Sequence, residues 1–350
     1  MSVTFSAPLM DAKHFPSSLI KAQPAFKLST CRLRRNSMPM SDVSTFNKAR
    51  YALAAAAFHL KDTEQQNTVL LPAYHCPALI EPFIYAGYKI IFYPQLADLS
   101  SDLKVFNSLL TPDITHVVVV RYFGFSQNAE LLMNSAHSAG KKVIEDNAHS
   151  LPHFWRTCAS KPVEVSASVS SIPKTLGAAD GGVLYLPGYK ANVQRPDIYV
   201  ELKALLSGSR LTPISAKHSK DMRYFHVGMQ AADCLRASRW LMLRSDYDAI
   251  SRQRRENYQY LAKQLLHSAA GEVLYPTLGE HDVPYMMPFL LSDTKWFSKL
   301  RESQIQVLRW EELVTPATGI ATDYQQQLVQ LPVHQDLSKS QLASIVNVFQ

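Results

Sequence analysis

Three stretches of the sequence decide the fold: Val143-Ile144-Glu145-Asp146-Asn147-Ala148-His149, Ser168-Val169-Ser170-Ser171-Ile172-Pro173-Lys174, and Asp180-Gly181-Gly182. The first is a predicted strand that ends in a carboxylate. In open α/β sheets the carboxyl ends of the strands form the ligand crevice, so we expect Asp146 to point toward a ligand. The second places two serines shortly before a lysine, and the third is a turn that leads into a new strand. Together they predict a ligand site at one edge of a sheet.

Each stretch also has an ordinary structural interpretation. Asp146 is of a type that caps the helix following a strand. Lys174 is one of many lysines, most of which face solvent in folded proteins. Serines before a lysine are usual in loops, and Asp180-Gly181-Gly182 is usual in turns. The order and spacing of the three stretches, and not any one of them, favours the functional interpretation.

Strand and helix signals alternate on both sides of these stretches. Apolar runs rich in Val and Ile predict strands over 68–71, 89–93, 115–120, 142–145 and 182–186, and the intervening segments predict helices over 47–60, 78–86 and 128–139. Strands separated by helices of this length form parallel crossover units. The sequence therefore predicts an α/β fold with a mostly parallel central sheet.

The pattern changes after about residue 220. A long region rich in Arg and Leu predicts one helix over roughly 230–266, and a shorter α+β stretch follows, with an apolar segment over 285–291 and helices over 296–304 and 339–349. Residues 1–45 contain Pro16, Pro24 and Pro39 and show little periodicity. We therefore predict an extended N-terminal arm (1–45), a large domain (46–245) and a small C-terminal α+β domain (246–350).

Composition excludes several classes of protein. The longest apolar stretch, Ala52–Leu60, is far shorter than the about 20 residues that span a bilayer. The N-terminus lacks the order of a signal peptide, and the four cysteines are scattered without metal or disulfide spacing. The nearest pair of histidines, His149 and His153, lacks a third ligand. We expect a cytoplasmic protein with reduced thiols and no metal.

The formal net charge is +7, and basic residues gather before residue 40. Such an arm suits nucleic acid or an anionic membrane, and it equally suits a solvated or partner-covering segment. No nucleic-acid motif accompanies it. We therefore predict neither a nucleic-acid nor a membrane partner.

In order and spacing, these residues resemble the sugar aminotransferases of the DegT, DnrJ and StrS family, which have the aspartate-aminotransferase-like fold of enzymes that use pyridoxal phosphate (PLP). The resemblance extends over about 45–350. Its central elements are Glu145-Asp146, Ala148, His149, the Ser170/Ser171 pair, Lys174 and Asp180-Gly181-Gly182, and its flanking elements are Lys48–Leu53, Leu71–Pro77 with Gly87-Tyr88, Tyr122-Phe123-Gly124 and Leu331–His334.

The resemblance implies the PLP-dependent transferase fold and a role for each site residue. Lys174 would carry the cofactor and move the substrate proton, and Asp146 would hold the pyridine nitrogen protonated so that the ring draws electrons. An aromatic residue after the second strand lies over the ring in this family, which here means Tyr74 or His75. His149 would lie against the other side of the ring or its 3′-oxygen.

The cofactor phosphate needs hydroxyls and backbone N–H groups at a helix N-terminus. Ser171, three residues before the lysine, and the amides of Ala49 and Arg50 match that need. Ser170 is the alternative if the local register differs.

Three departures from the family pattern stand out. Ala49 replaces a glycine of the phosphate loop. Arg223 and Phe225 stand where the family has an Asn-x-Arg segment that reaches the neighbouring subunit. Family glycines are also missing between Asp146 and Ser170. Arg223 and Tyr122 remain candidates for the substrate or partner side of the site.

The resemblance implies a PLP-dependent aminotransferase. It would move an amino group from an amino acid, with glutamate as the expected donor, to a nucleotide-linked keto sugar in surface-polysaccharide or secondary-metabolite sugar biosynthesis. A homodimer is expected, partly because 230–244 carries more large apolar residues than one amphipathic face needs. One alternative is a PLP-dependent sugar dehydratase, although such family members tend to replace the lysine with histidine. The other is a PLP-binding or regulatory protein that keeps the fold without turnover.

Overall fold

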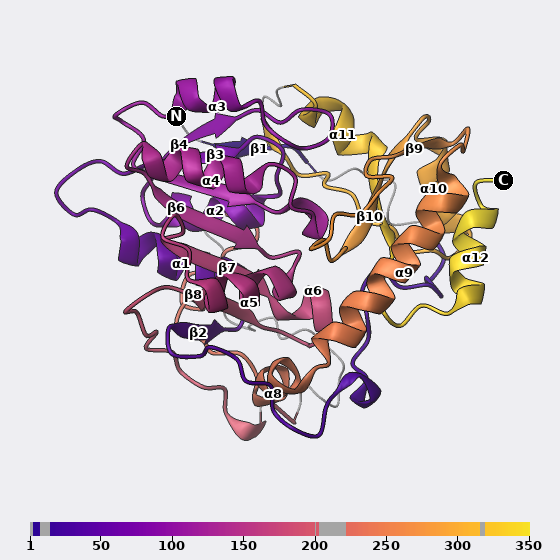
Figure 1. Ribbon diagram of the computed structural model, residues 1–350, viewed down its shortest axis with the longest axis horizontal. Helices are drawn as coiled ribbons and strands as arrows, with labels where there is room; N and C mark the ends of the chain where they lie inside the picture. The colour runs from indigo at the N-terminus through magenta and orange to yellow at the C-terminus, as the bar shows by residue number, and fades with distance from the viewer. Residues whose placement is uncertain (1–2, 8–14, 200, 203–221, 316–318) are drawn as a thin grey trace.

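A seven-stranded sheet forms the centre of the molecule (Figure 1). The structure is a computed structural model, and it describes residues 3–7, 15–199, 201–202, 222–315 and 319–350. The strand order is β2-β8-β7-β6-β5-β3-β4, with β2 (Val43–Phe46), β3 (Thr68–Pro72), β4 (Lys89–Tyr93), β5 (His116–Val120), β6 (Lys142–Asn147), β7 (Ala167–Ser171) and β8 (Gly182–Tyr185). The predicted α/β class is confirmed.

Strand direction follows from the length of each connection. Neighbouring strands are parallel in the series β4-β3-β5-β6-β7. Strand β8 is antiparallel to both β7 and β2. A parallel crossover needs a dozen or more residues. The connection between Ser171 and Gly182 is shorter than that and contains only the short helix α6 (Ile172–Leu176), so the chain reverses there.

Helices cover both faces of the sheet, and the pleat decides which side chains each face receives. Ile144 packs with the core on the side of α1 (Ala49–Leu60) and α2 (Pro77–Tyr85), whereas Val143 packs with the core of α3 (Leu103–Leu109) and α4 (Ala129–Ser138). Successive strand residues face opposite sides. Along β6, Glu145 therefore belongs to the α3/α4 side and Asp146 to the α1/α2 side.

The predicted long helix over 230–266 is wrong in one respect, because two helices occupy it. These are α8 (Arg236–Arg244) and α9 (Tyr247–Leu265). The Asp246 carboxylate accepts a hydrogen bond from the Ala249 amide at 3.0 Å, so it starts a new helix. The arginine-rich composition of this region gave no signal that the helix is interrupted between α8 and α9.

A second, antiparallel sheet lies in the C-terminal part, in the order β12-β10-β9. Helix α9 runs from near α6 and α8 into the C-terminal part, where α12 lies beside it (Figure 1). The remaining elements here are β9 (Gly271–Val273), β10 (Met286–Leu291), α10 (Lys295–Glu302), β11 (Val314–Thr315), α11 (Ala321–Gln327), β12 (Leu328–Pro332) and α12 (Lys339–Asn347). The predicted α+β character of this region is present.

The N-terminal segment lies against the rest of the chain. Strand β1 (Thr4–Phe5) pairs with β11, Ile20 bridges Ile305, and Cys31 bridges Ser245. The segment also includes a short 3-10 turn at Leu28–Thr30. The domain divisions at 45 and 245 stay predictions. In the described part of the chain, no helix is long and apolar enough to cross a bilayer.

Candidate active site

A cavity of about 190 Å³ opens where β3, β6 and β7 end. The carboxyl ends of parallel strands meet there, as the position of a ligand site in this kind of sheet requires. Among the predicted site residues, those that line it are Ala49, Arg50, His75, Asp146, Ser171 and Lys174.

The lysine stands on the short helix α6, directly after β7. Pro173 occupies the first turn of this helix, where its missing N–H costs nothing, and Gly177 ends it with φ 67°. A Cβ at Gly177 would lie 2.6 Å from the Ala25 carbonyl group, so the N-terminal segment packs directly against this turn. The Lys174 Nζ lies 5.6 Å from the centroid of the Tyr285 ring.

Asp146 is 3% exposed and faces the same cavity. Its Oδ1 accepts a hydrogen bond from the Ala148 amide at 2.7 Å. The helix that follows, α5 (Leu151–Ser160), is capped by Ser150, whose hydroxyl accepts from the His153 amide. Interpreting Asp146 as the cap of this helix is therefore wrong, and its carboxylate is turned to the cavity instead.

His75 approaches the other oxygen of this carboxylate. Its Nε2 lies 3.9 Å from Asp146 Oδ2, which is beyond hydrogen-bond distance. Burial lowers the pKa of His75 to about 4, although the Asp146 charge opposes that change. At neutral pH the imidazole is uncharged, so the negative charge of Asp146 is not neutralised by it.

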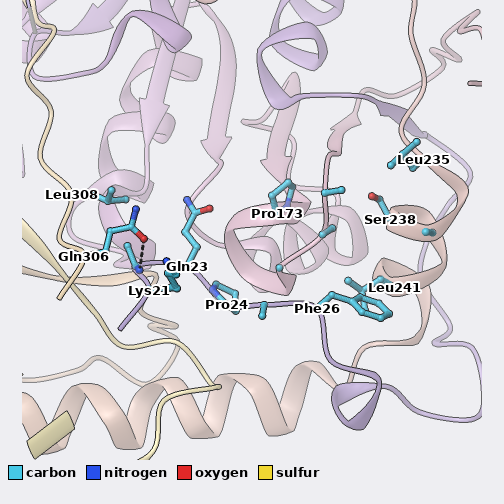
Figure 2. Close-up of a pocket in the computed structure, with 16 residues that line it drawn as sticks. Lys21, Gln23, Pro24, Phe26, Pro173, Leu235, Ser238, Leu241, Gln306 and Leu308 are labelled. Carbon is cyan, nitrogen blue, oxygen red and sulfur yellow. Dashed lines mark hydrogen bonds between the residues drawn. The ribbon is translucent and has the colours of Figure 1, made fainter. Parts of the chain in front are cut away.

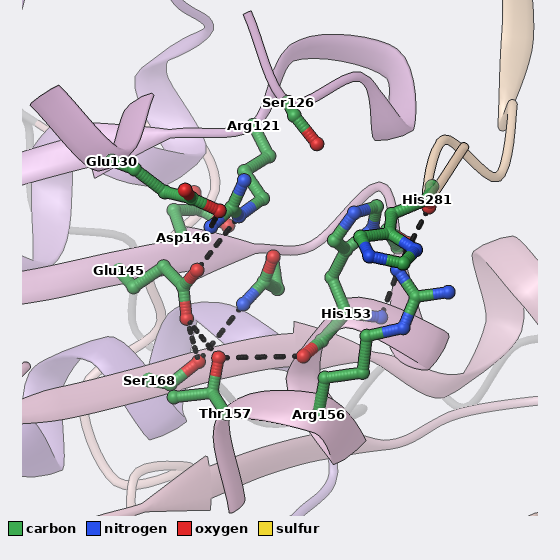
Figure 3. A network of polar contacts seen from close by, with 12 residues as sticks. Arg121, Ser126, Glu130, Glu145, Asp146, His153, Arg156, Thr157, Ser168 and His281 are labelled. Carbon is green, nitrogen blue, oxygen red and sulfur yellow. Dashed lines mark hydrogen bonds and ion pairs between the residues drawn. The ribbon is translucent and has the colours of Figure 1, made fainter. Parts of the chain in front are cut away.

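The neighbouring carboxylate, Glu145, points to the opposite face of the sheet, where it is fully engaged (Figure 3). Arg121 Nε donates to its Oε1 at 2.7 Å, and the hydroxyls of Thr157 and Ser168 donate to its Oε2 at 2.7 and 3.0 Å. A buried charge is retained only when it is paired and hydrogen-bonded in this way. Glu145 therefore anchors β6, which leaves Asp146 as the acid of the pair that faces the cavity.

The start of helix α1 also lines the cavity. No side chain caps this helix at Lys48, and Lys48, Ala49 and Arg50 all line the cavity. Uncapped N–H groups at a helix N-terminus attract an anion. The Arg50 guanidinium donates to the Tyr224 carbonyl and lies 5.4 Å from the centroid of the Tyr224 ring.

Ser170 and Ser171 have different surroundings, the first within the sheet and the second at the cavity. The Ser170 hydroxyl donates to the Asn147 carbonyl at 2.6 Å and is fully buried in the sheet. Ser171 lines the cavity, with no hydrogen bond from its side chain to the helix that it precedes. Of the two alternatives, Ser171 is the one that can meet a ligand.

The Asp180-Gly181-Gly182 stretch holds helices in place around the cavity. Asp180 accepts hydrogen bonds from the Leu235 amide at 3.1 Å and the Ser238 hydroxyl at 2.6 Å, at the start of α8. Burial raises the pKa of Asp180 to about 6. A Cβ at Gly182 would lie 2.4 Å from the Ala49 nitrogen, so only glycine lets β8 approach the start of α1 this closely.

Three predicted residues lie behind the cavity wall. His149 is stacked between the rings of Phe123 and Tyr285, with centroids 5.4 and 4.8 Å away, and its Nδ1 accepts from the Phe123 amide at 3.0 Å. Burial lowers the pKa of His149 well below its usual value. Tyr74 is buried, and its carbonyl accepts a hydrogen bond from the Tyr122 hydroxyl at 2.7 Å. Of the pair Tyr74 and His75, the structure turns His75 to the cavity.

Arg223 lies away from the cavity, at the surface of its own chain. Its guanidinium pairs with Glu312 and donates to the Ser6 carbonyl at 2.8 Å. The backbone amides of Arg223 and Phe225 donate to the Glu81 carboxylate at 2.6 Å each, which fixes this loop against α2. Its expected contact with a partner subunit stays a prediction.

Sequence analysis did not identify several residues that shape the site. Gln23 lines the cavity, and its Nε2 donates to the Tyr285 hydroxyl at 2.8 Å. Asn47 lines it with a buried Oδ1 that has no hydrogen-bond partner in the described structure. Trp310 packs on His75 with ring centroids 4.7 Å apart. These residues come from distant segments without a periodic signal, so the sequence offered no way to place them together.

A larger cavity of about 720 Å³ adjoins the first (Figure 2). Gln23, Pro173 and Ala179 line both cavities. The N-terminal segment 21–26, the turn after α6, the start of α8 and the segment with Gln306 and Leu308 supply the other lining residues. The lining is mixed, with Lys21, Ser238 and Gln306 among its polar groups. Its volume is within the range of about 300–1,000 Å³ of small-molecule sites.

Comparison with known proteins shows which fold this is. No protein family and no curated protein matches the sequence, but many solved structures match the fold. Helicobacter pylori PseC, an aminotransferase of pseudaminic acid biosynthesis, matches with a TM-score of 0.63 and 16% identity over 88% of this chain and 85% of its own. Spr1654 of Streptococcus pneumoniae, in a PMP form, gives 0.62 and 13% over 88% and 86%. The GDP-4-keto-6-deoxymannose-3-dehydratase ColD gives 0.61 and 12% over 88% of each chain.

The chain has the fold of the DegT, DnrJ and StrS sugar aminotransferases. The sugar-aminotransferase fold implies pyridoxal phosphate, and the donor set of the smaller cavity fits that cofactor. A lysine amine, a buried carboxylate, an uncapped helix start and the Ser171 hydroxyl all line this cavity. The unpartnered Asn47 Oδ1 at the same wall leaves a polar atom that a bound group would satisfy. Among the described residues, no cluster of His, Cys, Asp and Glu is arranged to hold a metal ion.

Proposed function

We propose that this protein is a PLP-dependent aminotransferase that transfers an amino group from an amino acid to a keto sugar. The observation that carries the proposal is the convergence of Lys174, Asp146, Ser171 and the start of α1 on one cavity within this fold. A carboxylate, a lysine and an anion cradle are the groups that bind and activate this cofactor.

The chain's own residues account for the chemistry. When bound, PLP supplies an electron sink for the carbon that loses and gains a proton. The Asp146 carboxylate, whose charge is not neutralised by His75, would hold the ring nitrogen of bound PLP protonated. Lys174 Nζ would accept the proton from the substrate carbon and return it, and the Tyr285 ring lies 5.6 Å from this amine. The amides at the start of α1 and the Ser171 hydroxyl would hold the cofactor phosphate.

The larger cavity is the proposed place of the keto sugar, because it shares a wall with the lysine cavity. We propose a nucleotide-linked keto sugar as acceptor, glutamate as donor, a role in surface-polysaccharide or secondary-metabolite sugar biosynthesis, and a cytoplasmic location. The support for these finer points is the resemblance of the sequence and the sugar-directed activities named for structural neighbours such as PseC.

The absorbance spectrum of the purified protein with added PLP tests the proposal. We expect a visible band that shifts when glutamate is added. Borohydride reduction followed by peptide mass mapping should place the pyridoxyl adduct on Lys174. An adduct on another lysine, or none, contradicts the cofactor assignment.

Two alternatives remain distinguishable. A sugar dehydratase is represented among the structural neighbours by ColD. Loss of a hydroxyl from the sugar as water, without transfer of an amino group to the sugar, would favour it. A binding protein without turnover is supported by the altered segment around Arg223, and a visible band with no turnover on any keto sugar would favour that alternative.

We also propose a homodimer in which Arg223 contributes to the partner's site. Lys174→Ala and Arg223→Ala chains should each be inactive alone, and a refolded mixture should regain activity because one site in the mixed dimer carries neither change. A mixture as inactive as its parents, or a monomer mass by light scattering, contradicts the shared site.

A further inference from the structure

The side chain of Arg254, on helix α9, is only 1% exposed. A buried charge is costly unless it is paired or completely hydrogen-bonded. None of the ion pairs among the described residues includes Arg254. Burial lowers its pKa to about 10, so the guanidinium is still a cation at neutral pH. A buried cation without a carboxylate partner needs another explanation.

The hydrogen bonds of Arg254 supply it. A guanidinium has five N–H donors in a rigid plane. Here they meet five oxygens: Nε donates to Gln335 Oε1 at 2.8 Å, Nη1 to the carbonyls of Pro284 and Tyr285 at 3.1 Å each, and Nη2 to the carbonyls of Lys174 and Thr175 at 3.2 and 3.1 Å. Every donor therefore has an acceptor.

One side of this arrangement fixes the backbone of the lysine itself. The last carbonyls of a helix have no partner within it, and α6 is too short to satisfy many of its own. Arg254 satisfies those of Lys174 and Thr175, and Gln335 Nε2 adds a second hydrogen bond to the Thr175 carbonyl at 3.1 Å. The turn that carries the amine is thus held to α9 and to the C-terminal part of the chain.

The other side fixes the backbone of Tyr285, whose ring lies near the amine. The Tyr285 carbonyl is bound by the same guanidinium, while its ring lies 5.6 Å from Lys174 Nζ and 4.8 Å from the His149 ring. One side chain therefore sets the position of both the lysine turn and the surface against which the amine lies.

We propose that Arg254 is a positioning residue for Lys174, and that its five hydrogen bonds hold the amine in the place from which it moves the substrate proton. The inference rests on the proposed function for the proton transfer, but the placement of the amine is a property of the chain alone. Lysine in place of Arg254 keeps the charge but has three donors in another geometry, so it cannot make the same contacts.

The test compares Arg254→Lys, Arg254→Met and the milder Gln335→Met with Arg255→Met. Arg255 is the matched control, because it follows on the same helix and donates to the carbonyls of Gly279 and Asp282 at 2.8 and 2.6 Å, away from the lysine. The first readout uses the protein without cofactor. Acetic anhydride labelling of Lys174 across pH, read by mass spectrometry, gives the midpoint at which the amine becomes reactive.

We expect that midpoint to rise by about one pH unit in Arg254→Met and in Arg254→Lys, because an amine no longer held in its partly buried place beside the Tyr285 ring is better solvated. In the loaded enzyme, Arg254→Lys and Arg254→Met should lower kcat by about 10²-fold, the scale of misplacing a reacting group by about 1 Å, with KM within about twofold. Gln335→Met should change both readouts in the same direction by less, and Arg255→Met should change neither.

The outcomes separate the two proposals. If wild-type protein forms no PLP adduct at Lys174, the proposed function fails while the labelling experiment still measures the role of Arg254. If the Arg254 variants label Lys174 as the wild type does, or if Arg255→Met shifts the midpoint equally, the positioning role is refuted. Should Arg254→Met fail to fold, Gln335→Met and Arg254→Lys decide by the same criteria.

Discussion

Gly182→Ala should damage the phosphate end of the site through a collision of backbones. A Cβ at this position would lie 2.4 Å from the Ala49 nitrogen and the Lys48 carbonyl carbon, and 2.5 Å from the Lys48 oxygen. Ordinary contact begins at 3.4 Å, so β8 and the start of α1 would have to separate by about 1 Å. All three of these atoms belong to the backbone, so no side chain can move aside to relieve the contact.

The magnitude has two parts. Overpacking of this kind destabilises a core by ~1–3 kcal/mol. Moving the start of α1 also weakens its charge-assisted hydrogen bonds to a phosphate, each of which contributes ~1.5–3 kcal/mol, so we expect PLP to bind at least ~10-fold more weakly. Urea unfolding of the protein without cofactor measures the first part, and a fluorescence titration with PLP measures the second.

Gly188→Ala provides the control. Gly188 has φ 72° with nothing within 4 Å of a Cβ, so alanine there introduces backbone strain of ~1–2 kcal/mol and no collision. It should leave PLP affinity unchanged. If Gly182→Ala binds PLP within twofold of the wild type, the start of α1 is not the phosphate cradle.

Three further outcomes are expected. Asp146→Asn should leave a folded protein whose turnover falls at least ~10²-fold, as when a key electrostatic contact is lost; near-normal turnover would mean that the carboxylate serves structure alone. Tyr74→Phe removes a buried hydroxyl without a described partner, so the free energy of unfolding of this variant should equal that of the wild type or exceed it by up to ~1 kcal/mol. His75→Ala should weaken PLP binding in the same fluorescence titration. The pKa of Asp180 is raised from 3.8 to about 6 in the folded state, so its stabilising contribution is full below pH 3.8 and is lost as pH rises through 6, by up to ~3 kcal/mol. Asp180→Asn should flatten that loss in urea unfolding between pH 4 and 7, and an unchanged profile would refute the assignment.

The sheet was predictable from the sequence because its strands are short apolar runs between strong breakers. The predicted strand 89–93 matches β4 at both ends, and 115–120 differs from β5 by one residue. The ligand edge was predictable for the same reason, since parallel strands must end together. The antiparallel turn into β8 depends on the length of the loop before it. The break between α8 and α9 depends on one capping side chain. The pattern of apolar residues contains neither kind of information.

The candidate site was predictable only where its residues come from strand ends. Choosing between Ser170 and Ser171 required knowing the residue at which β7 ends and α6 begins. Successive residues of a strand face opposite sides of the sheet, so an error of one residue selects the wrong serine. Arg254 carries no sequence signal, since it is one of several arginines in an arginine-rich helix. Arg254 is buried because the tertiary fold brings residues 284–285 and Gln335 against its side chain.

The alternation of Glu145 and Asp146 on opposite faces of β6 limits how this sequence can change in length. A single inserted or deleted residue within β6 would turn the Asp146 side chain away from the cavity and bring the Glu145 position toward it, without Arg121, Thr157 and Ser168 to neutralise it. The same change would break the buried ion pair between Arg121 and Glu145 and remove the Asp146 carboxylate from the cavity. Length variation among natural versions of this protein should therefore be confined to the connecting loops and be absent from β6.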